Sequence, residues 1–262
     1  MIDIWHADTY SQFLDMRTKP AKDLLAAIPD SFIPQRVYDL GCGPGNSTIL
    51  LKQRWSDAQV IGLDNSEDML REAKTTYPAL EFVADDLAIF HPNEQLDCIF
   101  ANASLQWLDN HAMLIPRLLR FLKPGGFLAI QMPNNFHFPS HQVTIQLLEN
   151  NPKWQYLLKV LRYGHLQAPF YHVADYYNIF TEAKVAELQL WETEYIQVMN
   201  NHQDIFNWVK GTGLRPILAK LEKTEQAEFE QAYVAAITQK YSLQQNGKVL
   251  LPFRRLFMVA KI

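Results

Sequence analysis

The chain contains 262 residues, of which 48% are hydrophobic and 20% are charged. This length and balance fit one large folded domain or a domain with an insertion, and they exclude a disordered or fibrous chain. The formal net charge is -4, so the chain as a whole does not attract nucleic acid or an anionic membrane. We therefore expect a small-molecule partner rather than a nucleic acid or a membrane.

The compartment can also be predicted from the sequence. The N-terminal residues have neither the basic start nor the apolar run of a signal peptide, and no apolar stretch reaches the ~18–20 residues that span a bilayer. Two cysteines, Cys42 and Cys98, are too few for a disulfide framework. We expect a cytoplasmic protein, and because nothing in the sequence demands a partner copy, a monomer.

The first half of the chain shows a regular alternation. A helical N-terminal part carries Tyr10 and Arg17, which either close over a ligand or belong to the core. Short apolar runs then alternate with helical segments up to residue 132, and they predict strands at 37–40, 59–63, 81–83, 97–101 and 127–132. This pattern predicts a doubly wound, mostly parallel, Rossmann-like α/β sheet, whose ligands bind at the carboxyl ends of the strands.

After residue 132 this rhythm breaks, and two mostly helical insertions precede the last two strands. We expect them to form a substrate lid; the alternative is that they only cover the edge of the sheet. We expect a single domain, 1–262, whose cofactor-binding core with N-terminal helices spans 1–132. The two helical insertions are expected at 133–183 and 200–247, and the last two strands at 184–199 and 248–262.

A glycine-rich loop follows the first predicted strand. Asp39 ends the strand, Gly41, Gly43 and Gly45 stand at alternate positions, and a helix begins near Asn46. Glycine permits a tight turn and lets the backbone approach a ligand without an intervening side chain. The spacing differs from the G-x-G-x-x-G of dinucleotide-binding dehydrogenases, which disfavours a nicotinamide oxidoreductase.

Acidic residues also follow the second and third predicted strands. Asp64 comes roughly twenty residues after the loop, where a ribose-binding acid belongs, and Asn65 follows it. Asp85 and Asp86 follow the third strand and precede Leu87. Taken singly, each acid could simply cap a helix, but their order along the chain favours a nucleotide site.

Together these features resemble the class I S-adenosylmethionine-dependent methyltransferases. The resemblance implies that the glycine loop contacts the methionine part of S-adenosylmethionine and that Asp64 binds the ribose hydroxyls. Asp86 fits the adenine-reading position better than Asp85. The further cofactor-binding residues that we assign are Tyr10, Asp39, Asn46, Asn65, Leu87 and Asn102.

Polar and aromatic side chains gather in five further stretches, at 102–108, 131–135, 191–195, 208–216 and 252–257. With the glycine loop, these stretches look like the trans-aconitate 2-methyltransferases, and the resemblance runs from about residue 10 to residue 260. The sequence differs from the usual family pattern in carrying Asn134 in place of an aspartate, and Glu192 and Glu194 on either side of Thr193.

The resemblance implies methyl transfer to a carboxylate of trans-aconitate. Such a carboxylate is ionised at pH 7 and is already a nucleophile, so we expect alignment to carry catalysis and assign neither a general base nor a metal. Arg215 is the first choice to receive a carboxylate, followed by Arg255 and Arg17, because a guanidinium binds carboxylates bidentately. The residues expected to wall and orient the substrate are Gln106, Trp107, Asn134, Trp191, Tyr195 and Trp208.

Two other functions remain open from the sequence. The same fold could methylate another small molecule at oxygen, carbon or nitrogen, and a carbon or nitrogen acceptor would require a base such as His141 or Tyr195. Alternatively, the chain could be a non-catalytic nucleotide-binding module whose insertions hold a protein partner, which predicts an exposed apolar patch on them. Arg215 itself could instead cap a helix or lie on a solvated face.

Overall fold

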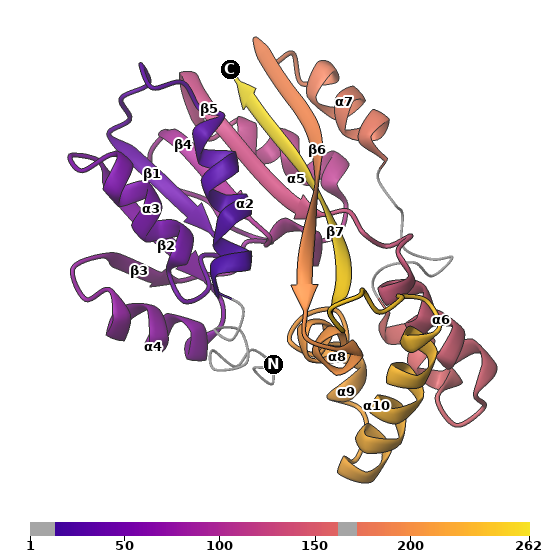
Figure 1. Cartoon of the computed structure of the whole chain (residues 1–262). Helices are drawn as coiled ribbons and strands as arrows, with labels where there is room; N and C mark the ends of the chain where they lie inside the picture. The colour runs from indigo at the N-terminus through magenta and orange to yellow at the C-terminus, as the bar shows by residue number, and fades with distance from the viewer. Residues whose placement is uncertain (1–13, 162–171) are drawn as a thin grey trace. The chain divides into compact units, whose positions relative to one another are not determined.

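The computed structural model describes residues 14–161 and 172–262, and the side chains from Thr18 onward within the first range. The chain forms two compact units (Figure 1). Unit 1 comprises Met1–Pro133, Tyr171–Thr193 and Arg255–Ile262, and unit 2 comprises Asn134–Phe170 and Glu194–Arg254. Among the described residues, no helix is both long and apolar enough to cross a bilayer.

A seven-stranded sheet has the order β3-β2-β1-β4-β5-β7-β6. Strands β3, β2, β1, β4 and β5 are joined by parallel pairings, and β7 runs antiparallel to β5. This mostly parallel sheet confirms the predicted Rossmann-like class. In sequence order the strands are Arg36–Leu40, Gln59–Asp64, Glu81–Ala84, Leu96–Asn102, Leu122–Pro133, Glu187–Met199 and Val249–Lys261.

The helices of unit 1 cover the sheet on both faces. On one face α3 lies close to β1 and bonds to Asp39, and α2 contacts both α3 and β5. On the other face α5 and α7 pack together on a core that contains Leu128 and Met258. The helices with described residues in this unit are α2 (Leu14–Ala26), α3 (Asn46–Arg54), α4 (Glu67–Thr76), η1 (Leu105–Trp107), α5 (His111–Leu119) and α7 (Val173–Glu182).

Several predicted boundaries differ from the structure. The expected insertion at 133–183 is divided, because α7 belongs to unit 1. Its Tyr176 and Phe180 are buried in the core of that unit, and the Tyr176 hydroxyl lies 2.6 Å from His111 Nδ1. Strands β6 and β7 lie within the predicted strand segments 184–199 and 248–262, whereas β5 begins at Leu122, before the predicted strand at 127–132.

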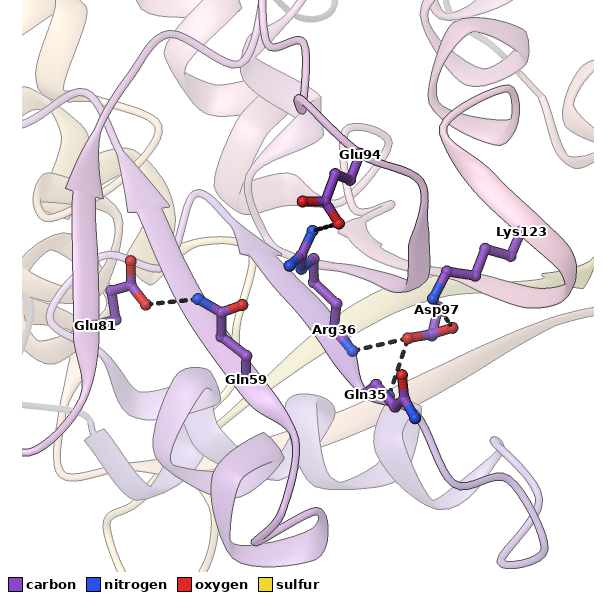
Figure 2. Close-up of polar contacts among 7 residues, drawn as sticks. All are labelled: Gln35, Arg36, Gln59, Glu81, Glu94, Asp97 and Lys123. Atoms are coloured by element: carbon purple, nitrogen blue, oxygen red, sulfur yellow. Dashed lines mark hydrogen bonds and ion pairs between the residues drawn. The ribbon is translucent and has the colours of Figure 1, made fainter.

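Polar side chains tie together the amino ends of the parallel strands (Figure 2). Asp97 Oδ2 accepts hydrogen bonds from the backbone amides of Gln35 and Arg36, and its Oδ1 accepts one of 2.9 Å from Lys123 Nζ. Burial alone would raise the pKa of Asp97, but these bonds hold it below its usual value. This edge of the sheet is thus held by internal contacts.

Unit 2 has its own buried interior. Phe206, Phe229 and Tyr233 are fully buried, and the Tyr233 hydroxyl donates a 2.7 Å hydrogen bond to the Ser140 carbonyl. Trp208 packs edge-on against Phe253. The helices with described residues in unit 2 are α6 (Pro139–Asn150), η2 (Gln155–Val160), α8 (His202–Lys210), α9 (Arg215–Leu218) and α10 (Lys223–Thr238).

Candidate active site

The glycine loop lies at the carboxyl end of β1 and needs its glycines for two different reasons. Gly41, Gly43 and Gly45 have φ angles of +73°, +54° and +90°, which strain residues with side chains. A Cβ on Gly41 would also lie 2.3 Å from Ser104 Cβ, whereas a Cβ on Gly43 would meet nothing within 4 Å. The base of the loop is therefore packed closely on the end of β4, while its tip is open to a ligand.

The helix that follows the loop presents its N-terminus beside it. Gly45 is the N-cap of α3 and provides no side chain to cap the first turn, which begins at Asn46. The first backbone N–H groups of a helix attract anions and polar ligand groups. This end of α3 can therefore receive the polar part of a cofactor.

Asp39 stabilises the junction between strand and helix from inside. It is fully buried, and its Oδ2 accepts hydrogen bonds of 2.7 Å from both Ser47 Oγ and Thr48 Oγ1. Burial raises the pKa of Asp39 to about 6, because removal from water disfavours the charged form more than the two hydroxyls compensate, and the negative charge of Asp64 raises it further. Asp39 thus holds α3 against the loop.

Acidic side chains end the next two strands, as predicted. Asp64 lies at the end of β2, where its Oδ2 accepts a 2.8 Å hydrogen bond from Gly43 N and its Oδ1 accepts one from Ser66 N. Asp86 follows β3, is partly exposed, and accepts a hydrogen bond from Ala88 N. The geometry brings the loop and Asp64 into direct contact.

The remaining predicted cofactor residues of unit 1 lie near these groups. Leu87 is buried, and its Cδ2 lies 3.6 Å from the position of a Cβ on Gly41. Asn65 is exposed directly after Asp64. Asn102 ends β4, with a buried Oδ1 that has no hydrogen-bond partner among the described residues. Tyr10 lies outside the described residues.

The end of β4 contains a contact that the sequence did not reveal. Ala103 adopts a positive φ of 55°, and the chain leaves the sheet there. Ser104 Oγ then donates a 2.6 Å hydrogen bond to the Leu40 carbonyl, and Ala103 N donates one of 2.8 Å to the Gln131 carbonyl. Ser104 therefore joins the glycine loop to the ends of β4 and β5, although no sequence signal marks the unusual φ of an alanine.

Five of the predicted substrate residues lie in unit 1. Gln106 donates a 2.7 Å hydrogen bond to the Ala103 carbonyl, and the neighbouring Trp107 is partly buried. Trp191 is stacked on Phe257 with ring centroids 4.8 Å apart. Arg255 is 6% exposed. Arg17 is part of the backbone of α2, but its side chain lies outside the described residues.

The other predicted substrate residues lie in unit 2. Arg215 is only 8% exposed at the start of α9, which rules out a solvated face, and Trp208 and Tyr195 are also buried. Asn134 is partly buried. The extra carboxylate of Glu194 forms an ion pair of 3.3 Å with Arg254, so its charge is balanced within this unit; Glu192 is exposed.

His141, one of the two candidate bases for transfer to carbon or nitrogen, has a pKa that does not suit that role. Its Nδ1 lies 3.5 Å from Asn135 Nδ2, and removal from water lowers the pKa of His141 to about 4. A general base works best with a pKa near the operating pH. Within the described residues, no three histidine, cysteine, aspartate or glutamate side chains gather into a metal site.

Comparison with known sequences decides the family. Residues 37–126 match a family described as a methyltransferase domain. The trans-aconitate 2-methyltransferase of Methylobacterium nodulans is 44% identical to this chain over 259 residues, which is 98% of each sequence. Proteins of the same name from Azoarcus sp. and Escherichia coli K12 are 45% and 42% identical, again over 98% of each chain. The chain belongs to the trans-aconitate 2-methyltransferase family.

Family membership confirms the predicted methyltransferase class and S-adenosylmethionine as the cofactor. The fold has solved counterparts as well. Phosphoethanolamine N-methyltransferase 2 of Haemonchus contortus is 15% identical, with a TM-score of 0.54 over 93% of this chain and 52% of that one. Coclaurine N-methyltransferase is 15% identical, with a TM-score of 0.52 over 95% of this chain and 72% of that one. At such identities the likeness shows the fold alone.

Proposed function

We propose that the protein forms a monomethyl ester of trans-aconitate by in-line transfer of a methyl group to one of its carboxylates. The observation that carries this proposal is the identity of 42–45% to trans-aconitate 2-methyltransferases over nearly the whole chain, which includes the substrate stretches as well as the cofactor loop. S-adenosylmethionine supplies an activated methyl group on a sulfonium. The residues of this chain bind and orient the cofactor and the substrate, and they exclude water.

The cofactor-binding residues that we propose fit such a group. The open tip of the loop at Gly43 admits a ligand to the backbone, and the uncapped N-terminus of α3 offers polar N–H groups. The carboxylates of Asp64 and Asp86 lie at the ends of the adjacent strands β2 and β3, where they can accept hydrogen bonds from the hydroxyl and amine groups of a nucleoside. Asp39 stabilises the start of α3 next to this loop by accepting a hydrogen bond from Ser47.

For the substrate we propose Arg215 as the first carboxylate receptor and Arg255 as the second. Both side chains are buried, so a carboxylate bound to them would be shielded from water. The planar fork of an arginine guanidinium holds a carboxylate bidentately in a fixed orientation. The described segments of unit 2 serve as the substrate lid in this proposal.

The reaction needs no proton acceptor, because the attacking carboxylate is already ionised at neutral pH. Catalysis then comes from holding the carboxylate oxygen in line with the methyl group in a site from which water is excluded. The lowered pKa of His141 agrees with this proposal, because a group with a pKa of about 4 is a weak base. We further propose that the enzyme is a cytoplasmic monomer; Cys42 and Cys98 are both buried free thiols, as a reducing compartment would leave them.

The proposal is tested by incubating the purified protein with methyl-labelled S-adenosylmethionine and trans-aconitate. We expect label in a product that releases methanol on mild alkaline hydrolysis, as a methyl ester does. Label that resists base would indicate transfer to carbon or nitrogen and would overturn the proposal. So would binding of S-adenosylhomocysteine without turnover, which is the behaviour of a non-catalytic module.

A further inference from the structure

Within the part of the chain that the structure describes, the buried side chain of Gln131, at the site edge of unit 1, makes none of the hydrogen bonds that buried polar groups normally make. Gln131 is 0% exposed, and neither its Nε2 nor its Oε1 has a hydrogen-bond partner among the described residues. Nearly all buried polar groups in folded proteins are hydrogen-bonded, because leaving them unpaired destabilises the fold. A buried amide with both ends unsatisfied therefore calls for an explanation beyond packing.

The position of Gln131 points to a ligand. Gln131 lies near the carboxyl end of β5, in register with Asn102 of the parallel strand β4 and opposite Phe257 of β7. Paired residues on neighbouring strands project from the same face of a sheet. The Gln131 amide thus lies between an aromatic ring and Asn102, whose own Oδ1 is buried without a partner in the same described region.

The same place is joined to the cofactor loop by backbone contacts. The Gln131 carbonyl accepts the hydrogen bond from Ala103 N, and the next residue, Ser104, packs where a Cβ on Gly41 would lie. One strand, β4, therefore separates the strand of this amide from β1, whose end leads into the loop that we assign to the cofactor. In open α/β sheets this edge is where ligands bind.

We propose that Gln131 is a substrate-binding residue whose Nε2 donates hydrogen bonds to a carboxylate of the anionic substrate; this inference rests on the proposed function. A neutral amide suits the task, because it donates to a carboxylate without adding a second buried charge. Gln131 Oε1 and Asn102 Oδ1 are both acceptors, and they suit the positively charged side of a sulfonium cofactor next to that carboxylate.

The burial of Gln131 has a consequence for binding. Because none of its surface is exposed, a carboxylate that is hydrogen-bonded to this amide would be shielded from water. Such exclusion strengthens a hydrogen bond to a carboxylate, since the surroundings on the Phe257 side are apolar.

The test compares Gln131→Met, which keeps the length and volume of the side chain but removes the amide, with Gln189→Met as a matched control. Gln189 is an exposed glutamine on β6, whose amide lies 3.4 Å from the Ala27 carbonyl. Three quantities are measured for each variant and the wild type: the urea midpoint, the affinity for S-adenosylhomocysteine, and kcat/KM with trans-aconitate. Calorimetric binding of trans-aconitate to the S-adenosylhomocysteine complex provides a readout independent of turnover.

We expect Gln131→Met to unfold at the same or a higher urea concentration, because an unpaired amide is replaced by an apolar group. Its kcat/KM and its affinity for trans-aconitate should fall about 10- to 100-fold, the size of a hydrogen bond to a charged group, while S-adenosylhomocysteine still binds. Gln189→Met should match the wild type. Unchanged kcat/KM and substrate affinity in Gln131→Met would overturn this inference alone, whereas absence of turnover by the wild type would overturn the proposed function and the inference with it.

Discussion

Replacing Asp39 by asparagine should stabilise the protein at neutral pH, although it removes a charged group from the strand end that leads into the cofactor loop. Asp39 is fully buried, and its pKa rises from 3.8 to about 6 on folding. At pH 8 the ionisation of Asp39 therefore lowers the free energy of unfolding by about 3 kcal/mol, relative to a side chain that stays neutral. Asparagine resembles the protonated carboxyl and keeps an acceptor for Ser47 and Thr48, so it avoids this cost.

The sign of the pH dependence follows from the raised pKa. The contribution of Asp39 to stability is fully present below pH 3.8 and is lost as the pH rises through about 6. The advantage of Asp39→Asn should thus be about 3 kcal/mol at pH 8, about half of that at pH 5, and small near pH 4.

Urea unfolding of both proteins at several pH values measures this difference directly, because the other titrating groups are common to both. Two results would contradict this prediction: a difference in the free energy of unfolding that does not change with pH, or a variant that is less stable than the wild type at pH 8. Retention of the carboxylate at such a cost indicates a use for its charge, so the affinity of the variant for S-adenosylmethionine should fall.

Three further predictions concern the loop, the substrate and the reaction. Gly41→Ala should destabilise the protein more than Gly43→Ala does, since only the former collides with Ser104 while both incur about 1–2 kcal/mol of backbone strain; equal urea midpoints would contradict the packing. Arg215→Lys should raise the KM for trans-aconitate about tenfold or more while S-adenosylhomocysteine binds as before. Arg254→Lys, which changes the ion pair with Glu194, should leave this KM unchanged. An unaltered KM in Arg215→Lys would show that Arg215 does not bind the substrate. With saturating cofactor, kcat should be flat between about pH 7 and 9 because no base is required, and a rise through a pKa in that range would reveal one.

The sheet and the cofactor loop could be predicted because their signals are local. An apolar strand, alternate glycines and an acid after each of the next two strands specify both the fold and the edge at which ligands bind. The structure shows the same arrangement, with Asp64 bonded to Gly43. The start of β5 differs from the prediction because Leu122 pairs with Leu96 of β4, and such pairing depends on residues far apart in the chain.

The features that sequence reasoning missed depend on tertiary contacts. A positive φ at Ala103 has no sequence signature, since alanine rarely adopts it, and so the sequence does not predict the contact of Ser104 with Leu40. Gln131 lies in the polar and aromatic stretch 131–135, but only the alignment of β4, β5 and β7 shows that its amide has no hydrogen-bond partner among the described residues. The sequence predicts α7 as part of an insertion because it is helical like its neighbours, whereas its contacts with α5 belong to unit 1.

The most direct test of the central claim is a competition among tricarboxylates. The enzyme receives methyl-labelled S-adenosylmethionine and an equimolar mixture of trans-aconitate, cis-aconitate, citrate and isocitrate, and the labelled esters are separated and counted early in the reaction. The ratios of the products then equal the ratios of kcat/KM. We expect the monomethyl ester of trans-aconitate to carry most of the label. Label found mainly in another ester, or in no ester, would contradict the proposed function.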